Sequence, residues 1–480
     1  MIAQDPRKED HNALSADLSG SCVRQGSFRE GSKIVFTVHH ELADIVYLVG
    51  SFNGWSESNP MKKTGSGIWQ TELSDNEIQD GDAYKFKVVY HGIHTYIADP
   101  YAVENEGAPH FNSVFRDLAD ELTDSYKKEE HTAFFNRPLN VLSICADVWN
   151  GGAHSYSDIA RELIPYMMQM GYTHLCMSGV FEEYYEFSSG CNLKANFAPR
   201  KEQGGIDELR QLVHLLHASG IGVLLDRGVT AVSDNEAADQ QFLADDARYW
   251  LDLYGFDGLV SSAASEGSAK MLSRVYRLLK REYENAYFFD RGLCGVSIPD
   301  ADAVLCDLNR VFADFVPTEN ETLKRFARMA AMSYLLVSEG KGITEIGCEL
   351  GISSEEALCG VAEVSAIQEK EDRTFQLYVS DLNAVYLSNP CLWNGESKRI
   401  VKKQQDAVTV ECKGEDCTVI FIADTSGRGC EIDITSLANP CVKLDSCIAR
   451  YGGKKCDDGF RISRDKLLLE PYEAVVILGE

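Results

Sequence analysis

The sequence predicts an α/β protein: a (β/α)₈ barrel with a β-sandwich before it and another after it along the chain. Between residues 139 and 394, apolar runs of strand length alternate with amphipathic stretches of helix length, as in a parallel sheet. Outside this region the apolar runs are short, rich in Val, Ile, Tyr and Phe, and separated by Gly, Asn, Asp and Ser. A chain of 480 residues is long enough for a barrel and two smaller domains.

The N-terminal part begins with a polar stretch, and we expect residues 1–30 to be a leader outside the folded domains. The runs KIVFTVHH, DIVYLVGSF, GIWQTEL and AYKFKVVYHG then predict a small antiparallel sandwich at residues 31–120. The charged stretch that follows, residues 121–138, predicts a linker.

The barrel region, residues 139–394, opens with the strand LNVLSICA, the helix SYSDIARELIPYMMQMG and the strand THLCMSGV. A second helix, IDELRQLVHLLHASG, ends at Gly220 and leads into the buried strand IGVLLD. Past the barrel, the runs AVTVEC, CTVIFIAD, CEIDIT and YEAVVILGE predict a C-terminal β domain at residues 395–480.

The charge of the chain limits its partners. A formal net charge of -28 argues against nucleic acid and against an anionic membrane, because both are bound through Lys and Arg. A neutral ligand such as a carbohydrate is indifferent to this charge. No run approaches the roughly 20 apolar residues that span a bilayer. The first residues lack the hydrophobic segment of a secretion signal, so we expect a cytoplasmic protein.

The 15 cysteines are expected to be reduced thiols in such a compartment. Seven of them fall late in the chain, but their spacing does not form the paired C-x-x-C of a zinc site. We therefore expect small buried side chains there, with no metal and no cofactor.

A resemblance to a known family enters at the N-terminal sandwich. VYLVGSFNGWSESNPMKK, AYKFKVVYHG and ADPYA resemble the glycogen-binding module that precedes glycogen branching enzymes and isoamylases and occurs in AMP-activated kinase regulatory subunits. The barrel is similar to that of branching enzymes in the alpha-amylase superfamily. The matching stretches are SYSDIARELIPYMMQMGYTHLCMSGVFE, NFAPRKEQGGIDELRQLVHLLHASGIGVLLD, GITEIGCELG (at the family's seventh strand) and FQLYVSDLNAVYLSNPCLW. The resemblance implies a carbohydrate-binding module, an amylase-type barrel and a C-terminal β-sandwich.

The residues that carry chemistry in this family are altered. Its members attack α-1,4-glucan with a carboxylate nucleophile and a second carboxylic acid that protonates the leaving oxygen. The nucleophile lies in D-G-L-R-V-D-A at the fourth strand, which here reads DGLVSSA. The resemblance places the family's Arg on Val260 and its nucleophile on Ser262. A serine without a base is a poor nucleophile and cannot stabilise a cationic transition state by charge.

The neighbouring motifs are also incomplete. The third-strand motif D-W-V-P-A-H keeps Asp226, a substrate-binding position, but its His falls on Ala231. The aromatic residue that stacks on the sugar falls on Cys191. The nearest candidates for the acid/base and for the third carboxylate are Asp290 and Asp307. The chain between Asp226 and the fourth strand is also much shorter than in branching enzymes, whose acceptor cleft is shaped there.

Other carboxylates offer an alternative. Glu266, Asp290 and Glu349 could supply the missing groups, although solvated loop carboxylates are the simpler interpretation in a chain with 74 acidic residues. Asp226 can also be interpreted as a helix cap without chemistry. His214 and His217 have no acidic partner motif that would complete a metal site, so a surface or packing role is favoured.

The N-terminal module carries the more complete site. Sugar modules cover the apolar face of glucose with aromatic rings and read its hydroxyls with a few polar groups. Trp55, Lys85 and Asn112 match family binding positions, and the second stacking ring falls at His94 or Tyr96. A packing role for Trp55 stays open, and Trp69, in the alternating run GIWQTEL, is expected in the core.

Three functions are compatible with these features. The first is a catalytically impaired, branching-enzyme-like protein that binds glycogen or another α-glucan and tethers or regulates glucan-metabolising enzymes. The second is an active branching enzyme or α-glucan hydrolase with displaced carboxylates. The third is a protein-interaction scaffold without affinity for sugar. We favour the first.

Overall fold

The structure, a computed structural model, covers the chain with gaps. It describes residues 25–65, 67–107, 109–118, 137–148, 154–186, 191–230, 236–292, 294–305, 311, 315–339, 341–348, 373–404, 406–434, 441–456, 462–463 and 466–479. The predicted linker lies almost wholly outside these residues. Two compact units form: one combines the chain up to residue 124 with residues 181–201, and the other holds residues 125–180 and 202–480.

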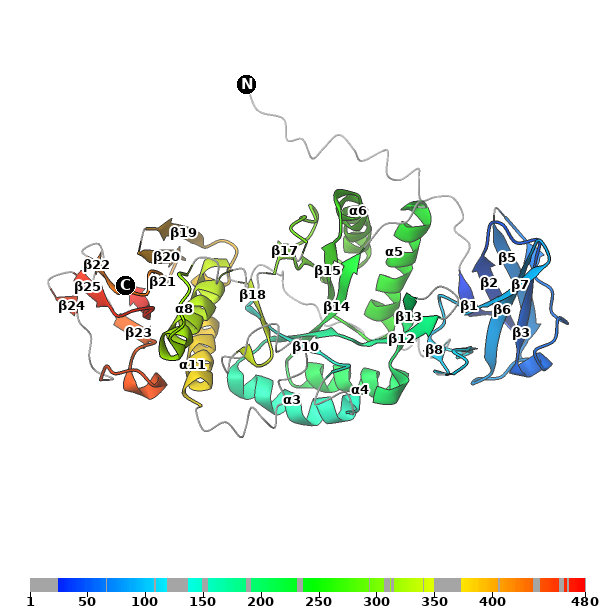
Figure 1. Cartoon of the computed structure of the whole chain (residues 1–480), viewed down its shortest axis with the longest axis horizontal. Helices are drawn as coiled ribbons and strands as arrows, with labels where there is room; N and C mark the ends of the chain where they lie inside the picture. The colour runs from blue at the N-terminus through cyan, green and yellow to red at the C-terminus, as the bar shows by residue number, and fades with distance from the viewer. Residues whose placement is uncertain are drawn as a thin grey trace, which may run out of the picture. The chain divides into compact units, whose positions relative to one another are not determined.

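The first unit contains a sandwich of two antiparallel sheets (Figure 1). One sheet has the order β1-β2-β5-β4; the other has the order β3-β6-β9-β8, with β7 paired to β6. Phe36, Trp69 and Phe86 are buried in the core between them. The strands are β1 Gly26–Glu30, β2 Lys33–His39, β3 Ile45–Gly50, β4 Lys62–Lys63, β5 Ile68–Ser74, β6 Ala83–Tyr90, β7 Ile93–Ile97, β8 Glu104–Asn105 and β9 Ser113–Val114.

Two expectations for this part can be judged directly. Trp69 is 5% exposed and donates from Nε1 to the His40 carbonyl at 3.1 Å, so its predicted place in the core is confirmed. The expected end of the leader at residue 30 is wrong, because β1 begins at Gly26 and pairs along the whole of its length with β2. The sequence GSFRE has Phe28 as its one large apolar residue, so its local pattern does not predict a strand. Pairing with the neighbouring strand is what gives β1 its extended conformation.

A hairpin from the expected barrel region also belongs to the first unit. It consists of β12 Phe181–Glu186 and β13 Cys191–Pro199. The ring of Phe197 stacks on Tyr101 with centroids 5.0 Å apart, and Lys201 pairs with Glu104 at 3.0 Å. These contacts join the hairpin to the module, although it lies in the middle of the barrel sequence.

The second unit is built on a parallel sheet of seven strands in the order β17-β16-β15-β14-β11-β10-β18. The pairing of β18 with β10 brings the last of these strands in chain order beside the first, as closure into a barrel requires. The described residues thus supply seven of the eight predicted strands. They are β10 Leu139–Cys145, β11 His174–Ser178, β14 Gly222–Thr230, β15 Gly258–Ala263, β16 Tyr287–Asp290, β17 Ala303–Val304 and β18 Lys341–Glu345.

Helices connect these strands, and α3 and α4, like α5 and α6, lie side by side (Figure 1). Ser155 caps α3 by accepting from the Asp158 N–H, and Gly171 ends it with φ 77°. The connection between β14 and β15 contains α5. The helices are α3 Tyr156–Met170, α4 Gly205–Ala218, α5 Glu236–Leu253, α6 Glu266–Glu282, α8 Glu321–Glu339 and α11 Thr374–Ser388.

The C-terminal β region forms two further sheets, with orders β19-β20-β21-β26-β23 and β22-β25-β24. Ile422, Leu467 and Ile477 share a buried cluster, and Tyr334 of α8 stacks on Phe421 of β21 with centroids 6.1 Å apart. The strands are β19 Lys398–Lys403, β20 Ala407–Lys413, β21 Thr418–Asp424, β22 Cys430–Asp433, β23 Cys441–Asp445, β24 Ile462–Ser463, β25 Lys466–Leu469 and β26 Ala474–Gly479.

The described residues lack two kinds of feature. None of the helices in this part of the chain has the length and apolar character that crossing a bilayer requires. The same residues hold no cluster of His, Cys, Asp and Glu that could bind a metal ion.

Candidate functional site

A hollow of about 540 Å³ opens on the N-terminal module. Most of the sequence-predicted sugar residues of this module meet there. The residues that line it are Ser51, Trp55, Ala83, Lys85, Tyr96, Glu106, His110 and Asn112.

Trp55 reaches the hollow from a tight turn. The turn begins with the 3₁₀ helix at Ser51–Asn53, and the Trp55 N–H donates to the Gly50 carbonyl at 2.8 Å. Trp55 itself has a φ of 61°, which is rare for a bulky residue. Such a conformation persists where the surrounding structure determines it. The turn thereby leaves Trp55 38% exposed at the module surface instead of in the core.

Lys85 and Ala83 enter from β6, where alternate residues share a face of the sheet. The Lys85 ammonium donates to the carbonyl of His110 at 2.6 Å. This bond fixes the position of the ammonium, a group that can only donate hydrogen bonds, at the wall of the hollow.

Tyr96 lies on β7, two residues after His94 on the same face. Its ring is 47% exposed, and the ammonium of Lys87 lies 5.5 Å from the ring centroid. Lys87 also pairs with Glu57 at 2.6 Å. The ring is therefore supported by a cation that is itself held by a carboxylate. His94, two residues earlier on the strand, is exposed and does not line the hollow. Tyr96 therefore supplies the second aromatic ring of the hollow.

Asn112 forms the inner polar wall. It is 8% exposed, and its Nδ2 donates to Glu106 Oε2 at 2.7 Å. The backbone ties the same two residues together, because the Glu106 N–H donates to the Asn112 carbonyl at 2.9 Å. An amide and a carboxylate are thus held next to each other at the edge of the hollow.

This arrangement suits a sugar. Two exposed aromatic rings, an ammonium, an amide and a carboxylate provide stacking surfaces together with donors and acceptors for hydroxyl groups. The sequence motifs located Trp55, Lys85 and Asn112 there. Sequence reasoning missed Glu106 and His110, which lie in a loop between short strands where no periodicity marks the inward-facing residues.

At the ends of the strands of the parallel sheet, two of the candidate catalytic residues are buried. Ser262 is 1% exposed and lies opposite Val229 of the neighbouring strand. Asp290 is fully buried, and its two carboxylate oxygens accept from the backbone N–H groups of Gly292 and Ile298 at 2.8 and 2.9 Å. Both of its oxygens are thus engaged in holding the loop that follows β16.

Asp226 belongs to a buried ion network at the same strand ends. Arg291 pairs with Asp226 through one guanidinium nitrogen and with Glu345 through the other. All three side chains are nearly inaccessible. Burial opposes the charge of Arg291, but the two carboxylates outweigh it and raise the pKa of its guanidinium above the ordinary value.

The helix-cap interpretation of Asp226 stays a prediction, because the residues just before α5 lie outside the described part of the chain. The second oxygen of Asp226 accepts from the Gly228 N–H at 2.8 Å, so the carboxylate fixes the end of β14 and pairs with Arg291. Arg291 and Glu345 were missed in the sequence, where a single Arg after FFD and a single Glu in GITEIG were the available signals.

The next residue forms a second buried pair, Arg227 with Asp246 of α5 at 2.8 Å. Burial raises the pKa of Asp246 to about 7, and the partly opposing effects of Arg227 and a hydrogen bond from Trp250 do not restore it. Carboxylates at this end of the sheet are therefore engaged in ion pairs and in backbone hydrogen bonds.

The remaining sequence candidates have simpler surroundings. Glu266 is exposed in the first turn of α6, where its charge suits the helix N-terminus. His214 is exposed, and His217 Nε2 lies 2.9 Å from Asp257 Oδ2, which confirms surface and packing roles. Asp307 and Glu349 lie outside the described residues.

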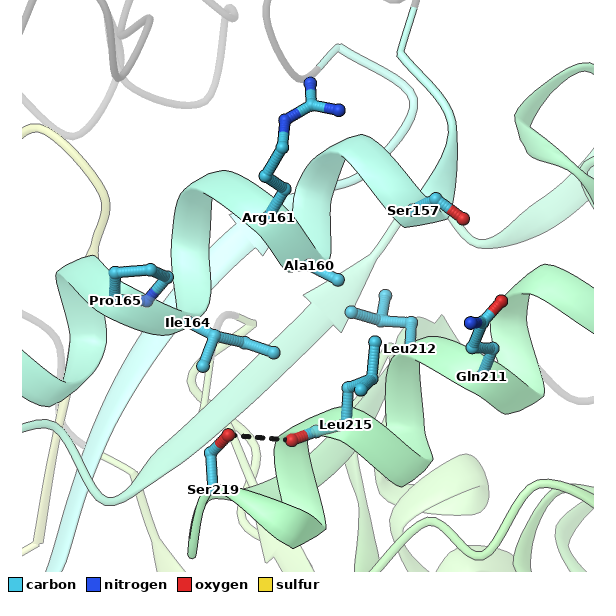
Figure 2. A pocket seen from close by; sticks show the side chains of 9 residues that line it. All are labelled: Ser157, Ala160, Arg161, Ile164, Pro165, Gln211, Leu212, Leu215 and Ser219. Atoms are coloured by element: carbon cyan, nitrogen blue, oxygen red, sulfur yellow. Dashed lines mark hydrogen bonds between the residues drawn. The ribbon is translucent and has the colours of Figure 1, made fainter.

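A second hollow, of about 430 Å³, lies between α3 and α4 (Figure 2). The side chains of Ile164, Leu212 and Leu215 point into it, and Ser219 at its rim donates to the Leu215 carbonyl at 2.9 Å. It contains none of the sequence-predicted site residues and offers few polar groups, so the module hollow is the stronger candidate.

Comparisons with known proteins agree with this ranking. Residues 22–102 match the family described as Carbohydrate-binding module 48 (isoamylase N-terminal domain). That range contains Trp55, Lys85 and Tyr96, and it ends before Glu106 and Asn112.

Relatives among curated proteins include 1,4-alpha-glucan branching enzymes. That of Corynebacterium glutamicum is 35% identical over 196 residues, which are 40% of this chain and 26% of the enzyme. That of Lactiplantibacillus plantarum is 28% identical over 309 residues, or 55% of this chain and 48% of the enzyme. The chain spans about a quarter to a half of the length of these relatives.

Solved pullulanases share the fold. A pullulanase of Anoxybacillus in complex with maltotetraose has a TM-score of 0.69 at 14% identity, over 98% of this chain and 89% of that one. A mutant pullulanase of Paenibacillus barengoltzii with maltotriose has a TM-score of 0.72 at 12% identity, over 96% of each chain. The chain is thus similar in sequence to branching enzymes over part of its length, and it has the fold of the pullulanases.

Proposed function

We propose that this protein binds glycogen or a related α-glucan through the hollow of its N-terminal module and does not branch or hydrolyse it. In this proposal the protein is a pseudoenzyme that tethers or regulates enzymes acting on the same polymer. The observation that carries the binding is the convergence of Trp55, Tyr96, Lys85 and Asn112 on one open hollow.

The ion network at the strand ends supports the loss of catalysis. A retaining mechanism needs one free carboxylate to attack and one carboxylic acid to protonate the leaving oxygen. Here Asp226 and Glu345 are paired with Arg291, and both oxygens of Asp290 accept backbone hydrogen bonds. A carboxylate held in this way offers neither an exposed nucleophile nor a transferable proton.

The first experiment combines a glycogen co-sedimentation assay with an iodine-stain branching assay on amylose, using one preparation. We expect retention on glycogen without a change in the iodine spectrum. A time-dependent loss of colour that survives repurification would establish an active enzyme with displaced carboxylates. Absence of retention would favour a scaffold without affinity for sugar.

The variant Trp55→Ala tests the site itself. We expect its affinity for glycogen to fall by roughly tenfold or more, because burying one large apolar side chain contributes about 1.5–3 kcal/mol. Tyr90→Ala is the matched control, since Tyr90 is similarly exposed at 37% on the same module and does not line the hollow. Equal affinities of the two variants would show that the glucan binds elsewhere.

A further inference from the structure

Among the described residues that line the module hollow, Glu106 is the one carboxylate. It is not one of the sugar-binding positions that the sequence motifs predicted. Its side chain is exposed, as a ligand-binding group must be in the free protein. Lys85 and Asn112 in the same wall supply donors, so the carboxylate provides the acceptor character that a sugar hydroxyl, itself a donor, requires.

The carboxylate is fixed in place before any ligand arrives. Its Oε2 accepts from Asn112 Nδ2 at 2.7 Å, and the backbones of the two residues are joined by a hydrogen bond of 2.9 Å. The preceding residue, Asn105, is 3% exposed, and its side chain accepts from the Gly107 N–H at 2.9 Å, which holds the backbone on the other side of Glu106. A preorganised group loses little conformational entropy on binding.

One oxygen of this carboxylate remains for a ligand. Within the described residues Oε1 of Glu106 accepts no hydrogen bond, whereas Oε2 is engaged by Asn112. A carboxylate oxygen has two acceptor positions, and a hydrogen bond to a charged acceptor is stronger than one between neutral groups.

We infer that Glu106 is a sugar-binding and specificity-determining residue that accepts a hydroxyl proton of an α-glucan through Oε1 while Oε2 positions Asn112. This inference rests on the proposed function, since it assigns a role within the same hollow. The class of ligand is a neutral α-linked glucose oligomer with its ring hydroxyls free. An analogue that lacks the hydroxyl bound by Glu106 should bind more weakly, because it covers the carboxylate oxygen without donating to it.

Titration of maltoheptaose into the full-length protein separates the two roles of Glu106. Glu106→Gln keeps an oxygen that can accept from Asn112 but replaces the second acceptor with a donor. Glu106→Ala removes both. We expect each to lower the affinity by about tenfold or more, the scale of a hydrogen bond to a charged group. Glu72→Gln, an exposed carboxylate on β5 of the other sheet that pairs with Lys33, is the matched control and should bind as the unaltered protein does.

The outcomes are distinct. If only Glu106→Ala loses affinity, Glu106 merely positions Asn112, and the inference is wrong. If neither variant loses affinity while the unaltered protein binds, the inference is wrong and the proposed function stands. If the unaltered protein does not bind maltoheptaose, the proposed function fails and the role of Glu106 fails with it.

A second measurement tests direct contact. Methyl α-maltosides that each lack one hydroxyl are compared on the unaltered protein and on Glu106→Ala. We expect one analogue to bind about tenfold more weakly than the parent sugar to the unaltered protein and equally well to the variant. Losses that are the same in both proteins for every analogue would overturn the inference.

Discussion

Arg291 is the residue that distinguishes the strand ends of this parallel sheet. It follows β16 directly, its backbone N–H donates to the Ser261 carbonyl at 3.0 Å, and its guanidinium joins Asp226 of β14 to Glu345 of β18. Three strands are thereby connected by one side chain. A positive charge between two buried carboxylates attracts both, and removing it would leave both carboxylates buried without this partner.

Arg291→Met should lower the free energy of unfolding by about 3–5 kcal/mol, the cost of breaking a buried ion pair by removing one partner. Urea denaturation followed by tryptophan fluorescence measures this. Arg161→Met, at a position where the side chain is 68% exposed on α3, is the control and should change stability little.

A combined variant checks the cause of this loss. Replacing Asp226 with Asn and Glu345 with Gln in the Arg291→Met background removes the unpaired charges, and we expect it to recover part of the lost stability. A combined variant less stable than Arg291→Met alone would mean that these carboxylates stabilise the fold by other contacts.

At the scale of elements, the sequence predicted the strands and helices whose hydrophobic pattern is local. The alternation of apolar runs and amphipathic stretches located β14, β15, α3 and α4, because buried parallel strands and surface helices have distinct periods. It missed β1, whose pairing partner determines its conformation. The hairpin of β12 and β13 joins the module through Tyr101 and Phe197, which are 96 positions apart and therefore invisible to a local pattern.

In the candidate site, too, residues in local motifs could be predicted and residues placed by long-range contacts could not. Trp55 and Lys85 lie in short motifs that mark their positions, and Ala83 follows from the two-residue period of β6. Glu106 and His110 depend on how a loop folds back over the sheet. The pairing of Arg291 with Asp226 and Glu345 joins positions 65 and 54 residues apart, which only the curvature of the sheet brings together.

Asp257 illustrates how one carboxylate connects elements. It precedes β15, accepts from the Val223 N–H of β14 at 2.7 Å, and lies 2.9 Å from Nε2 of His217 on α4. Burial raises the pKa of Asp257, but the hydrogen bonds from His217 and Val223 outweigh it, so the pKa lies below its ordinary value. A depressed carboxyl pKa stabilises the fold above the unfolded-state pKa of about 3.9 and loses this effect as pH falls through the folded-state pKa.

Asp257→Asn should therefore cost about 1–3 kcal/mol of unfolding free energy at pH 7, where the carboxylate is ionised. The difference from the unaltered protein should shrink as the pH falls below about 4. Urea denaturation at a series of pH values measures both. Asp416→Asn, at an exposed position between β20 and β21, is a suitable control. A difference that stays constant down to the lowest pH would show that charge is not the cause.

At the scale of the whole molecule, the net charge of -28 and the proposed ligand belong to one argument. A strongly acidic protein repels anionic polymers, whereas a glucan carries no charge and is neither attracted nor repelled at a distance. The contacts proposed for the glucan in the module hollow are stacking and short hydrogen bonds. Such contacts act at a range below the screening length of physiological salt, about 8 Å.

Retention on glycogen should therefore change by less than about twofold between 50 and 500 mM sodium chloride, because no counterions are released on binding a neutral polymer. Co-sedimentation across this series measures it, and the same series with dextran sulfate, an anionic glucan, is the comparison. We expect the sulfated polymer to be bound more weakly at low salt, where the repulsion is least screened. Affinity for glycogen that falls steeply with salt would mean that ionic contacts hold the ligand, and the hollow between Trp55 and Tyr96 would then not be the principal site.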